Sequence, residues 1–500
     1  MAIRMISLPE QPINLGRGWP SPRLLPLQAL RSAAEAVLSQ SGRATESMLY
    51  GPAMGDPALR VCVAEWLSRL YHLRSPPAKT HTPHQLADHH TGPTANPISP
   101  DRISITNGAS GNLATILSAF TDPLYTRRIW MVEPTYYLAC TIFEDAGFQG
   151  RLVGIPEDEN GVNLDYLRSK LTQVDREAEE LLAGPPSRFK RTPQYGKLYR
   201  HVIYLFPTFS NPSGKTYSLA NREGLVRLAR DFDALLVTDD CYDFLSWKAD
   251  SHPGKSETKH DSGTFSTTEE RPLPAAPPPP RLVDIDASFP GGDREWGNAV
   301  SSGSFSKVIG PGMRCGWTEA TPTFIKRLNA VGVLISGGAP SQFASVLIDH
   351  VLRTGALEHH LATNVIPVYQ LRYSAIKSAI SNELVPLGVK IDTGAPWVTA
   401  GNGNQRAEGV IGGFFLFIIF PEGVAADDVA AIASREYNLR ILPASIMAVR
   451  GSPKSENEER LLTRGARLCW AWEEEEMLVE GVRRIALILK DRFLLTQILK

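Results

Sequence analysis

The sequence predicts an α/β protein in which helices cover both faces of a mostly parallel sheet. Three observations support this fold class. Short apolar runs alternate along the chain with segments of helical periodicity. In one helical segment Leu225, Leu228, Ala229 and Phe232 recur at i, i+3, i+4 and i+7 and define an apolar face. The apolar run "ALLVT" follows that segment at once. Such alternation is typical of parallel strands joined by helices.

The alternation can be followed in order along the chain. The run "RISIT" precedes the helical segment "GNLATILSAF", and "RRIWMVE" precedes "TYYLACTIFEDAG". Next come "HVIYLF" with "SLANREGLVRLARDFD", then "ALLVT" and "GNAVSSG". The most apolar stretch, Gly409 to Phe420, is too short to span a bilayer, so it is predicted to be one buried strand.

Length and composition limit the classes of protein that fit. A chain of 500 residues is too long for one ordinary core, so two or more structural units are expected. Hydrophobic residues make up 43%, charged residues 21%, and the net charge is −1, which fits a soluble protein without a general affinity for nucleic acid or membranes. The N-terminus lacks the apolar run of a secretory signal, and a cytoplasmic location is expected. The cysteines have no CxxC spacing and are expected to be reduced thiols: Cys62, Cys140, Cys241, Cys315 and Cys469.

Three segments are predicted to be inserted surface loops. Residues 74–100, 181–197 and 248–281 are polar and rich in proline, so they bury too little apolar area to offset their ordering entropy. The first contains four histidines that suggest a metal site, but a disordered tract supplies no fixed ligand geometry, and no metal site is predicted: His81, His84, His89 and His90.

In open parallel sheets, ligands bind beyond the carboxyl ends of the strands, so the residues after each run are the candidates for chemistry. After "RISIT", Gly108, Ala109 and Ser110 open a helix, where backbone N–H groups can hold a phosphate. A plain tight turn is the alternative. Tyr136 comes after "RRIWMVE". It is either an aromatic residue that stacks on a ligand or an ordinary packing residue. Asn211 comes after "HVIYLF". Its amide either faces the crevice at the strand ends, or the residue is only part of a turn.

The last two strand ends carry charge. Asp239 and Tyr242 follow "ALLVT", and a carboxylate there is costly unless it meets a cation or water. The stretch "SSGSFSKVIGPGMRCGW" then places Ser304, Lys307 and Arg314 close together. This lysine is either a surface residue or one that reaches a bound cofactor. Taken together, the strand ends match an aromatic heterocycle that bears a phosphate, an aldehyde, a phenolic oxygen and a ring nitrogen, which describes pyridoxal phosphate.

The order of these motifs resembles the fold-type I pyridoxal-phosphate enzymes, specifically the class I/II aminotransferases. The resemblance is nearest to the branch with aromatic and 2-aminoadipate aminotransferases and their fungal relatives. It rests on "INLGRGWPSPRLLP", "YGPAMGDPALR", "ITNGASGNL", "EPTYY", "PTFSNPSG", "VTDDCYDF", "SFSKVIGPGMRCGW" and "ARLCWAWEEEE". It implies a large cofactor-binding domain over residues 45–345 and a smaller α/β domain over 346–500, which the N-terminal segment 1–44 joins.

The resemblance also implies a role for each matching residue. Lys307 is similar to the lysine that forms a Schiff base with the cofactor and then transfers the proton. Asp239 matches the carboxylate that keeps the ring nitrogen protonated. Tyr242 and Asn211 match the groups that hydrogen-bond the phenolic oxygen, and Tyr136 resembles the aromatic residue that stacks on the ring.

Other roles concern the phosphate and the substrate. Ser304 and Arg314 match the phosphate contacts, which the backbone of Gly108, Ala109 and Ser110 completes. Tyr50 resembles the tyrosine that reaches the phosphate from a neighbouring subunit, which implies a homodimer with shared active sites. Arg467 matches the arginine that binds the α-carboxylate of the substrate, with Gly18 nearby. A surface charge is the alternative for Arg467.

The resemblance implies transamination between an L-amino acid and a 2-oxo acid by a ping-pong mechanism, as part of amino acid metabolism or biosynthesis. Trp19 and Tyr136 favour aromatic or long aliphatic substrates. The segment Leu442 to Gly451 differs from many relatives on the substrate side of the pocket. Two alternatives stay open: a pyridoxal-phosphate-dependent C–S lyase that carries out β-elimination, and a non-catalytic cofactor-binding regulator, for which no helix-turn-helix segment precedes Gly16.

Overall fold

The computed structural model describes residues 11–71, 97–181, 187–191, 193–249, 278–394, 396–398 and 409–494. The four histidines considered as metal ligands lie outside these ranges, as do residues 74–96, 182–186, 192 and 250–277 of the three predicted insertions. In the described part of the chain, no helix combines the length and apolarity needed to cross a membrane. All five cysteines are described, buried and free of disulfides.

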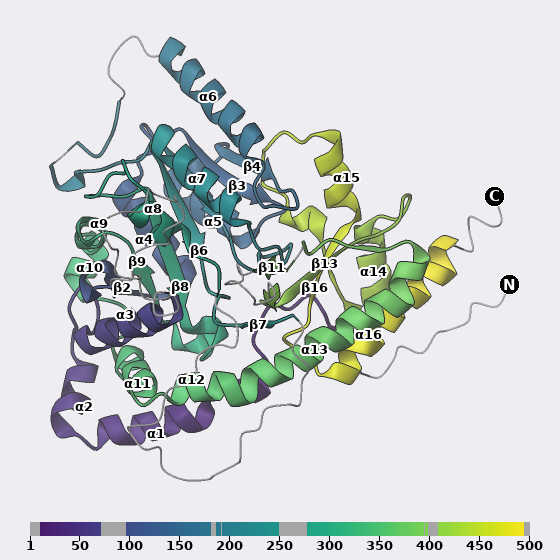
Figure 1. The fold of residues 1–500 in the computed structure, drawn as a ribbon, viewed down its shortest axis with the longest axis horizontal. Helices are drawn as coiled ribbons and strands as arrows, with labels where there is room; N and C mark the ends of the chain where they lie inside the picture. Colours follow the sequence, from purple (N-terminus) through teal and green to yellow (C-terminus); the bar gives the residue numbers. More distant parts are fainter. Residues whose placement is uncertain are drawn as a thin grey trace, which may run out of the picture.

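Seven strands form the main sheet, in the order β2-β9-β8-β6-β5-β3-β4 (Figure 1). The strands β4, β3, β5, β6 and β8 run parallel to one another, while β9 is antiparallel to both of its neighbours. The α/β class with a mostly parallel sheet is therefore confirmed. The strand bounds are β2 Ile103–Thr106, β3 Arg128–Glu133, β4 Leu152–Pro156, β5 His201–Leu205, β6 Ala234–Asp239, β8 Ala299–Ser304 and β9 Gly316–Glu319.

Helices cover both faces of this sheet because its central strands are apolar on both sides. In β3, Ile129 and Met131 join the core formed with helices α3, α4 and α5, while Trp130 and Val132 join the core formed with α6, α7 and α8. This alternation follows from the two-residue repeat of a strand. The helix bounds are α3 Pro57–Tyr71, α4 Gly108–Phe120, α5 Leu138–Phe143, α6 Leu164–Leu181, α7 Leu219–Asp231 and α8 Leu282–Ser288.

A second, smaller sheet has the order β10-β13-β16-β15 and is antiparallel where strands pair. The N-terminal strand β1 (Ile13–Asn14) pairs in parallel with β14 (Leu439–Arg440), so this N-terminal segment lies beside the part of the chain that carries the smaller sheet. The other bounds here are β10 Lys390–Ile391, β13 Phe415–Ile419, β15 Leu442–Pro443, β16 Gly465–Cys469, α13 Ile366–Ala379, α14 Ala426–Glu436, α15 Glu456–Arg464 and α16 Glu475–Ile488.

The stretch Gly409 to Phe420, predicted as one buried strand, forms two. Strand β12 (Gly409–Gly412) pairs with β11 (Trp397–Val398) and β7 (Ser246–Lys248), whereas β13 belongs to the four-stranded sheet. The chain changes sheet at Gly413, whose φ of +77° is favourable for glycine alone. Its Cβ would also lie 2.5 Å from the Cβ of Phe209.

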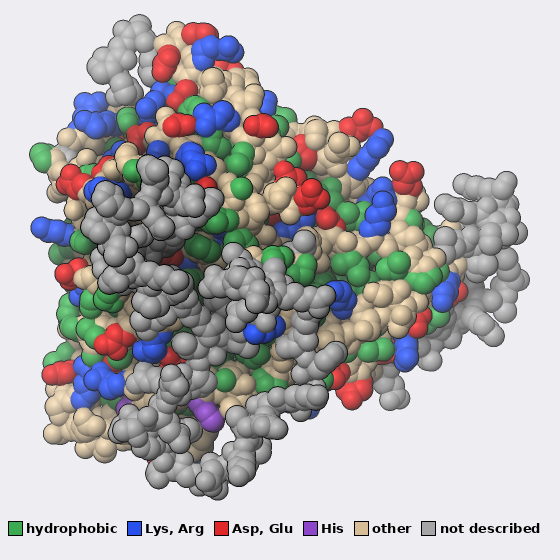
Figure 2. Space-filling model, in the orientation of Figure 1, with side chains coloured by type: hydrophobic (Ala, Val, Ile, Leu, Met, Phe, Trp, Pro, Cys, Tyr) green, Lys and Arg blue, Asp and Glu red, His purple; other side chains and the backbone are tan. Residues whose placement is uncertain are grey.

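The remaining helices lie beside the main sheet or connect the two sheets: α1 Leu27–Leu38, α2 Ser41–Met48, α9 Pro322–Leu328, α10 Gly332–Gly337, α11 Gln342–Arg353 and α12 Ala356–His360. Figure 2 shows acidic and basic side chains interspersed over the described part of the visible face. This mixture agrees with the net charge of −1 and gives that face no large area of a single sign.

A buried ion pair connects the two sheets. Glu157 follows β4, and its Oε2 lies 3.8 Å from Nζ of Lys215. The same Nζ lies 3.4 Å from Oδ2 of Asp392, just after β10. Burial raises the pKa of Glu157 to about 7, although the positive charge of Lys215 opposes this shift.

Replacing Glu157 with glutamine is therefore expected to stabilise the protein above pH 7. A carboxyl group whose pKa is raised in the folded state favours folding below its unfolded pKa, and this contribution is lost as the pH rises through about 7. The shift corresponds to an upper limit of about 3 kcal/mol. Thermal unfolding measured at pH 5 and pH 8 checks this. An equal effect of Glu157→Gln at both pH values would contradict it, and the exposed Glu456→Gln is a matched control.

Candidate active site

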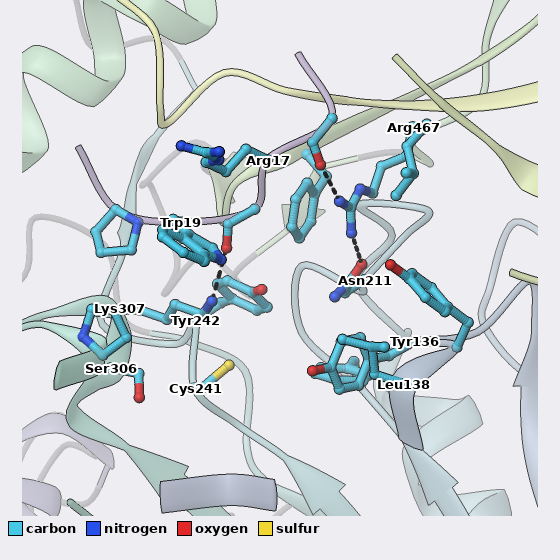
Figure 3. A pocket seen from close by; sticks show the side chains of 18 of the residues that line it. Arg17, Trp19, Tyr136, Leu138, Asn211, Cys241, Tyr242, Ser306, Lys307 and Arg467 are labelled. Atoms are coloured by element: carbon cyan, nitrogen blue, oxygen red, sulfur yellow. Dashed lines mark hydrogen bonds between the residues drawn. The ribbon is translucent and has the colours of Figure 1, made fainter. Parts of the chain in front are cut away.

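A cavity of about 640 Å³ lies at the carboxyl ends of β5, β6 and β8, beside the N-terminal segment and the small sheet (Figure 3). Because these strands are parallel, their ends meet at one edge of the sheet. Most residues singled out in the sequence line this cavity: Gly18, Ala109, Ser110, Tyr136, Asn211, Asp239, Tyr242, Ser304, Lys307, Arg314 and Arg467.

Lys307 lies in a short 3-10 turn, Phe305–Lys307, directly after β8. Its Nζ donates a hydrogen bond to the carbonyl oxygen of Gly18 at 3.0 Å. Burial lowers the pKa of Lys307, while the nearby Cys241 and Asp239 oppose this shift. A lysine with a lowered pKa is a better nucleophile and base near neutral pH, which is the property a catalytic amine needs.

Asp239 is the last residue of β6, and only 6% of it is exposed. Burial raises its pKa to about 6, and a hydrogen bond with the thiol of Cys241 opposes the shift. Its Oδ1 has no hydrogen-bond partner among the described residues. A buried carboxylate with an orphaned oxygen is costly, so the site suits a ligand that brings a cation or an N–H donor. A protonated ring nitrogen meets this need.

Aromatic and amide groups surround the space between these two residues. Tyr242 is buried, and burial raises the pKa of its phenol well above the usual range, so it stays a hydrogen-bond donor. Its ring lies 5.6 Å from Nζ of Lys307. The side chain of Asn211 accepts a hydrogen bond from Arg467, which leaves its amide nitrogen as the donor toward a ligand. Tyr136 also lines the cavity, with its hydroxyl hydrogen-bonded to Ser110.

The start of α4 forms one wall of the cavity. Gly108 is its first residue, with a φ of +72°, and the first N–H groups of a helix lack intrahelical partners. Arg314 donates from Nη2 to the carbonyl oxygen of Asn107 at 3.0 Å, so its guanidinium lies beside this helix end. A Cβ on Gly108 would come within 3.0 Å of that Nη2, which makes glycine the fitting residue there. Gly108 contributes backbone next to the cavity, and Ala109 and Ser110 line it directly.

Serine hydroxyls complete this wall. The hydroxyls of Ser304 and Ser306 are 2.9 Å apart, and the N–H of Ser306 donates to Ser304 Oγ. A guanidinium, two hydroxyls and free helix N–H groups are the donors that a phosphate needs. The residues present therefore fit pyridoxal phosphate: an amine for the aldehyde, a carboxylate for the ring nitrogen, and donors for the phosphate.

Arg467 lies in β16 on the opposite side of the cavity from Lys307 in Figure 3. It is 6% exposed, and its Nη1 and Nη2 donate to Asn211 Oδ1 at 2.7 Å and to the carbonyl oxygen of Gly16 at 2.6 Å. Its Nε has no partner, and no carboxylate pairs with it in the described part of the chain. A buried guanidinium without a counter-ion is costly, so a carboxylate from a ligand would stabilise it. The surface-charge alternative for Arg467 is therefore wrong.

Replacing Arg467 with glutamine is expected to raise KM for all amino acids by about 10- to 100-fold for each charge-assisted hydrogen bond that is lost. Arg467→Lys should recover only part of the lost affinity, because a single ammonium does not reproduce the planar guanidinium, which donates from two nitrogens at once. Steady-state kinetics check both variants, with the exposed Arg460→Gln as control. An unchanged KM in Arg467→Gln would contradict the assignment of a carboxylate to this side chain.

Tyr50 does not line the cavity of the single chain and is 89% exposed. The structure also adds lining residues that the sequence reading did not single out: Ser306, Cys241, Phe415, Arg17 and Arg440. The spacing Ser-x-Ser-Lys was the available signal for Ser306. Phe415 and Arg440 lie far along the chain from the strand-end motifs, and no local pattern marks them.

The comparisons with known proteins define the class. Residues 10–372 match the family "Aminotransferase class I and II". An uncharacterized protein of Saccharomyces cerevisiae is 31% identical over 89% of this chain and 90% of its own length. Aromatic-amino-acid aminotransferase 1 of Thermococcus litoralis is 25% identical over 96% of this chain and 88% of its own. The kynurenine aminotransferase of Pyrococcus horikoshii has the same fold, with a TM-score of 0.68 at 22% identity over 96% of this chain and 91% of that one.

This chain therefore belongs to the class I and II aminotransferases. It has the fold-type I architecture expected from the sequence motifs and is a pyridoxal-phosphate-dependent aminotransferase.

Proposed function

We propose that this aminotransferase moves an amino group between an L-amino acid with an aromatic or long aliphatic side chain and a 2-oxo acid, and that it acts in the cytoplasm. The observation that carries the proposal is the placement of Arg467 and Lys307 in one cavity. Arg467 is a buried cation without a carboxylate partner among the described residues, and Lys307 is a buried amine with a lowered pKa. An α-amino acid brings a carboxylate for Arg467 and an α-C–H bond whose proton a neutral amine at Lys307 can accept.

Each residue then has a defined task. When bound, the cofactor supplies an electron-accepting ring that makes removal of the α-proton of the amino acid possible. Arg467 holds the α-carboxylate, which orients the α-C–H bond toward Lys307. Lys307 would accept that proton on Nζ and, with the cofactor bound, would deliver it on the cofactor side of the reacting bond. Asp239 would hold the protonated ring nitrogen through its otherwise unpartnered Oδ1, and Tyr242 and Asn211 would donate to the phenolic oxygen.

The phosphate anchors the cofactor at the start of α4. Arg314, Ser304 and the backbone N–H groups of Gly108, Ala109 and Ser110 are its proposed donors, and Ser306 joins them because its hydroxyl lies beside that of Ser304. Since the phosphate takes no part in proton transfer, its binding energy serves to fix the ring near Lys307.

Aromatic side chains near Lys307 support the proposed substrate preference. Trp19 is 55% exposed and lines the cavity. Tyr136 and Phe415 line it as well. The named relatives that act on aromatic amino acids and kynurenine agree with a broad apolar surface for the side chain.

The protein is proposed to be a homodimer in which Tyr50 of each chain reaches the phosphate of the other. Helices α1, α2 and α10 expose large apolar side chains, and Ala339 N–H donates to the carbonyl oxygen of Pro52, so the loop after α2 lies against the end of α10. An apolar surface of this kind favours burial against a second copy. The exposed residues are Leu27, Leu38, Met48, Leu49, Tyr50, Val333 and Ile335. The separate seven-stranded and four-stranded sheets support the proposed division into 1–44, 45–345 and 346–500.

The experiment that tests the function separates the two half-reactions. The holoenzyme is mixed with one amino acid at a time and no oxo acid, and the visible spectrum is followed. Transamination predicts conversion of the cofactor to its amine form with one equivalent of the matching 2-oxo acid. Release of ammonia and pyruvate from a cysteine conjugate would instead indicate β-elimination. No spectral change with any amino acid would contradict the proposal.

A further inference from the structure

A second large cavity lies at the opposite edge of the main sheet from the cofactor site. Its volume is about 560 Å³, which is within the range of small-molecule binding sites. Its walls are the amino ends of β3, β4, β5 and β6 and the second half of α6. Because β6 spans about 17 Å from its amino end to Asp239 in the cofactor cavity, the two cavities are separate. No described residue lines both.

Positive charge dominates the lining of this second cavity. The acidic residues among its described lining are Glu177 and Asp233, and both have other partners. Asp233 lies 2.6 Å from Nζ of Lys197, and Glu177 accepts from the side chain of Gln173 at 2.8 Å. An excess of cations in a cleft with low-dielectric walls favours an anionic ligand. The four arginines that line the cavity are Arg127, Arg128, Arg151 and Arg200.

The register of the sheet places two of these arginines opposite each other. The N–H of Ile129 donates to the carbonyl oxygen of Arg151 at 3.1 Å in the parallel β3–β4 ladder. Arg128, one residue before Ile129, is therefore the cross-strand neighbour of Arg151. Two residues further along each strand, Trp130 and Val153 pack in the core formed with α6. The side chains of Arg128 and Arg151 thus lie on this same face, under α6.

Neither of these two guanidinium groups has a carboxylate at ion-pair distance in the described part of the chain. Arg128 donates from Nη1 to the carbonyl oxygen of Arg127 at 3.0 Å, and Arg151 donates from Nη1 to that of Thr126 at 3.2 Å. Burial lowers the pKa of Arg128, and the charge of Arg151 lowers it further, while Glu177 opposes both. Like charges opposite each other on neighbouring strands destabilise a sheet, so an anion between them would remove a cost.

The other two arginines are fixed by an acidic residue of α6. Asp175 forms an ion pair with Arg127, and its Oδ2 lies 3.5 Å from Nη1 of Arg200. Its Oδ1 also lies 2.8 Å from Nε2 of His201. These contacts hold α6 against the strand ends, so the walls of the second cavity are formed before a ligand binds. Arg128 and Arg151 are then the charges that a ligand can neutralise.

The cavity also has apolar walls and an open position in the molecule. Leu124, Val174 and Ala178 line it beside the arginines, which gives room for the organic part of a ligand. In Figure 1, α6 lies at the opposite end of the view from α1 and α2. The proposed dimer surface on α1 and α2 therefore leaves this cavity accessible.

We propose that the second cavity binds the phosphate group of a small molecule, with Arg128 and Arg151 as the groups that hold it. A phosphate suits the site because it carries close to two negative charges and meets the planar forks of two guanidinium groups at once. Free phosphate and an organic phosphate ester share this chemistry. The inference does not depend on the proposed function, since none of these residues belongs to the cofactor cavity.

Titration calorimetry and thermal unfolding of the holoenzyme, whose cofactor site is filled, test the proposal. The probes are inorganic phosphate and phenyl phosphate, with sodium chloride at equal ionic strength as reference. The wild type is expected to bind phosphate and to melt at a higher temperature in its presence. Arg128→Gln and Arg151→Gln should each weaken binding by about 10- to 100-fold. Arg176→Gln, exposed on α6, is the matched control and should bind as the wild type does.

The two probes distinguish the sources of the phosphate. Tighter binding of phenyl phosphate indicates an organic ester that uses the apolar walls, and equal binding indicates the free anion. Wild-type holoenzyme that binds neither probe would overturn the proposal, as would wild-type affinity in the variant that carries both substitutions. Binding that is lost in Arg467→Gln and kept in Arg128→Gln would place the phosphate in the cofactor cavity and would overturn it as well.

A stability measurement separates a binding role of Arg128 from a structural one. In sodium chloride alone, Arg128→Gln should melt at or above the wild-type temperature, because the substitution removes the repulsion from Arg151. A lower melting temperature together with unchanged phosphate affinity would make Arg128 a residue that only supports the sheet, and the proposal would be wrong.

Discussion

The Lys307→Ala protein is expected to fold normally and to lose turnover by at least about 10²- to 10⁴-fold, the contribution of a positioned proton-transfer group. Lys307 is the only lysine among the described residues that line the cavity, so no second amine is placed to replace it. The variant should also lose the visible absorbance that a covalently attached cofactor gives. Loss of the buried amine removes an unfavourable desolvation, so the melting temperature should not fall for electrostatic reasons.

Three measurements check this result: steady-state turnover, the visible spectrum of the purified protein, and thermal unfolding. Lys326→Ala is the matched control, because Lys326 lies exposed on α9 away from the cavity. Added methylamine should restore part of the turnover if the missing function is proton transfer. Full activity in Lys307→Ala would contradict the proposed mechanism.

Replacing Asp239 with asparagine should lower kcat by about 10²- to 10³-fold, the usual effect of removing one electrostatic group that stabilises a transition state. Asparagine keeps the shape and can still hydrogen-bond, so much of the cofactor should remain bound. It carries no negative charge, however, and therefore does not keep the ring nitrogen protonated.

The pH dependence of cofactor binding provides a second test of the role of Asp239. Burial raises its pKa to about 6, so the carboxylate is charged above that pH and becomes protonated below it. Affinity of the wild type for pyridoxal phosphate should fall as the pH drops through about 6, and Asp239→Asn should lose this step. Fluorescence titration at pH 5 and pH 8 measures it, with the exposed Asp231→Asn as control. The same step in Asp239→Asn would assign it to another group.

Much of this site could be predicted because parallel strands bring their ends to one edge. Asp239 ends β6 and Lys307 lies in the turn directly after β8, so their placement needed only the fold class. The position of Arg467 depended on resemblance, since it lies in a strand of the other sheet. Arg17 and Phe415 escaped prediction because their role arises from packing of the N-terminal segment against β16, which no local pattern encodes. The break at Gly413 was also missed, because a continuous apolar run hides a change of sheet.

The bond from Arg467 to the carbonyl of Gly16 joins residues 451 positions apart. During translation the first of these leaves the ribosome long before the second has been made. The N-terminal segment around Gly16 therefore cannot form this hydrogen bond until nearly all of the polypeptide has been synthesised. The complete substrate site is then among the last parts of the protein to form, and a chain that ends before Arg467 lacks the side chain proposed to hold the α-carboxylate.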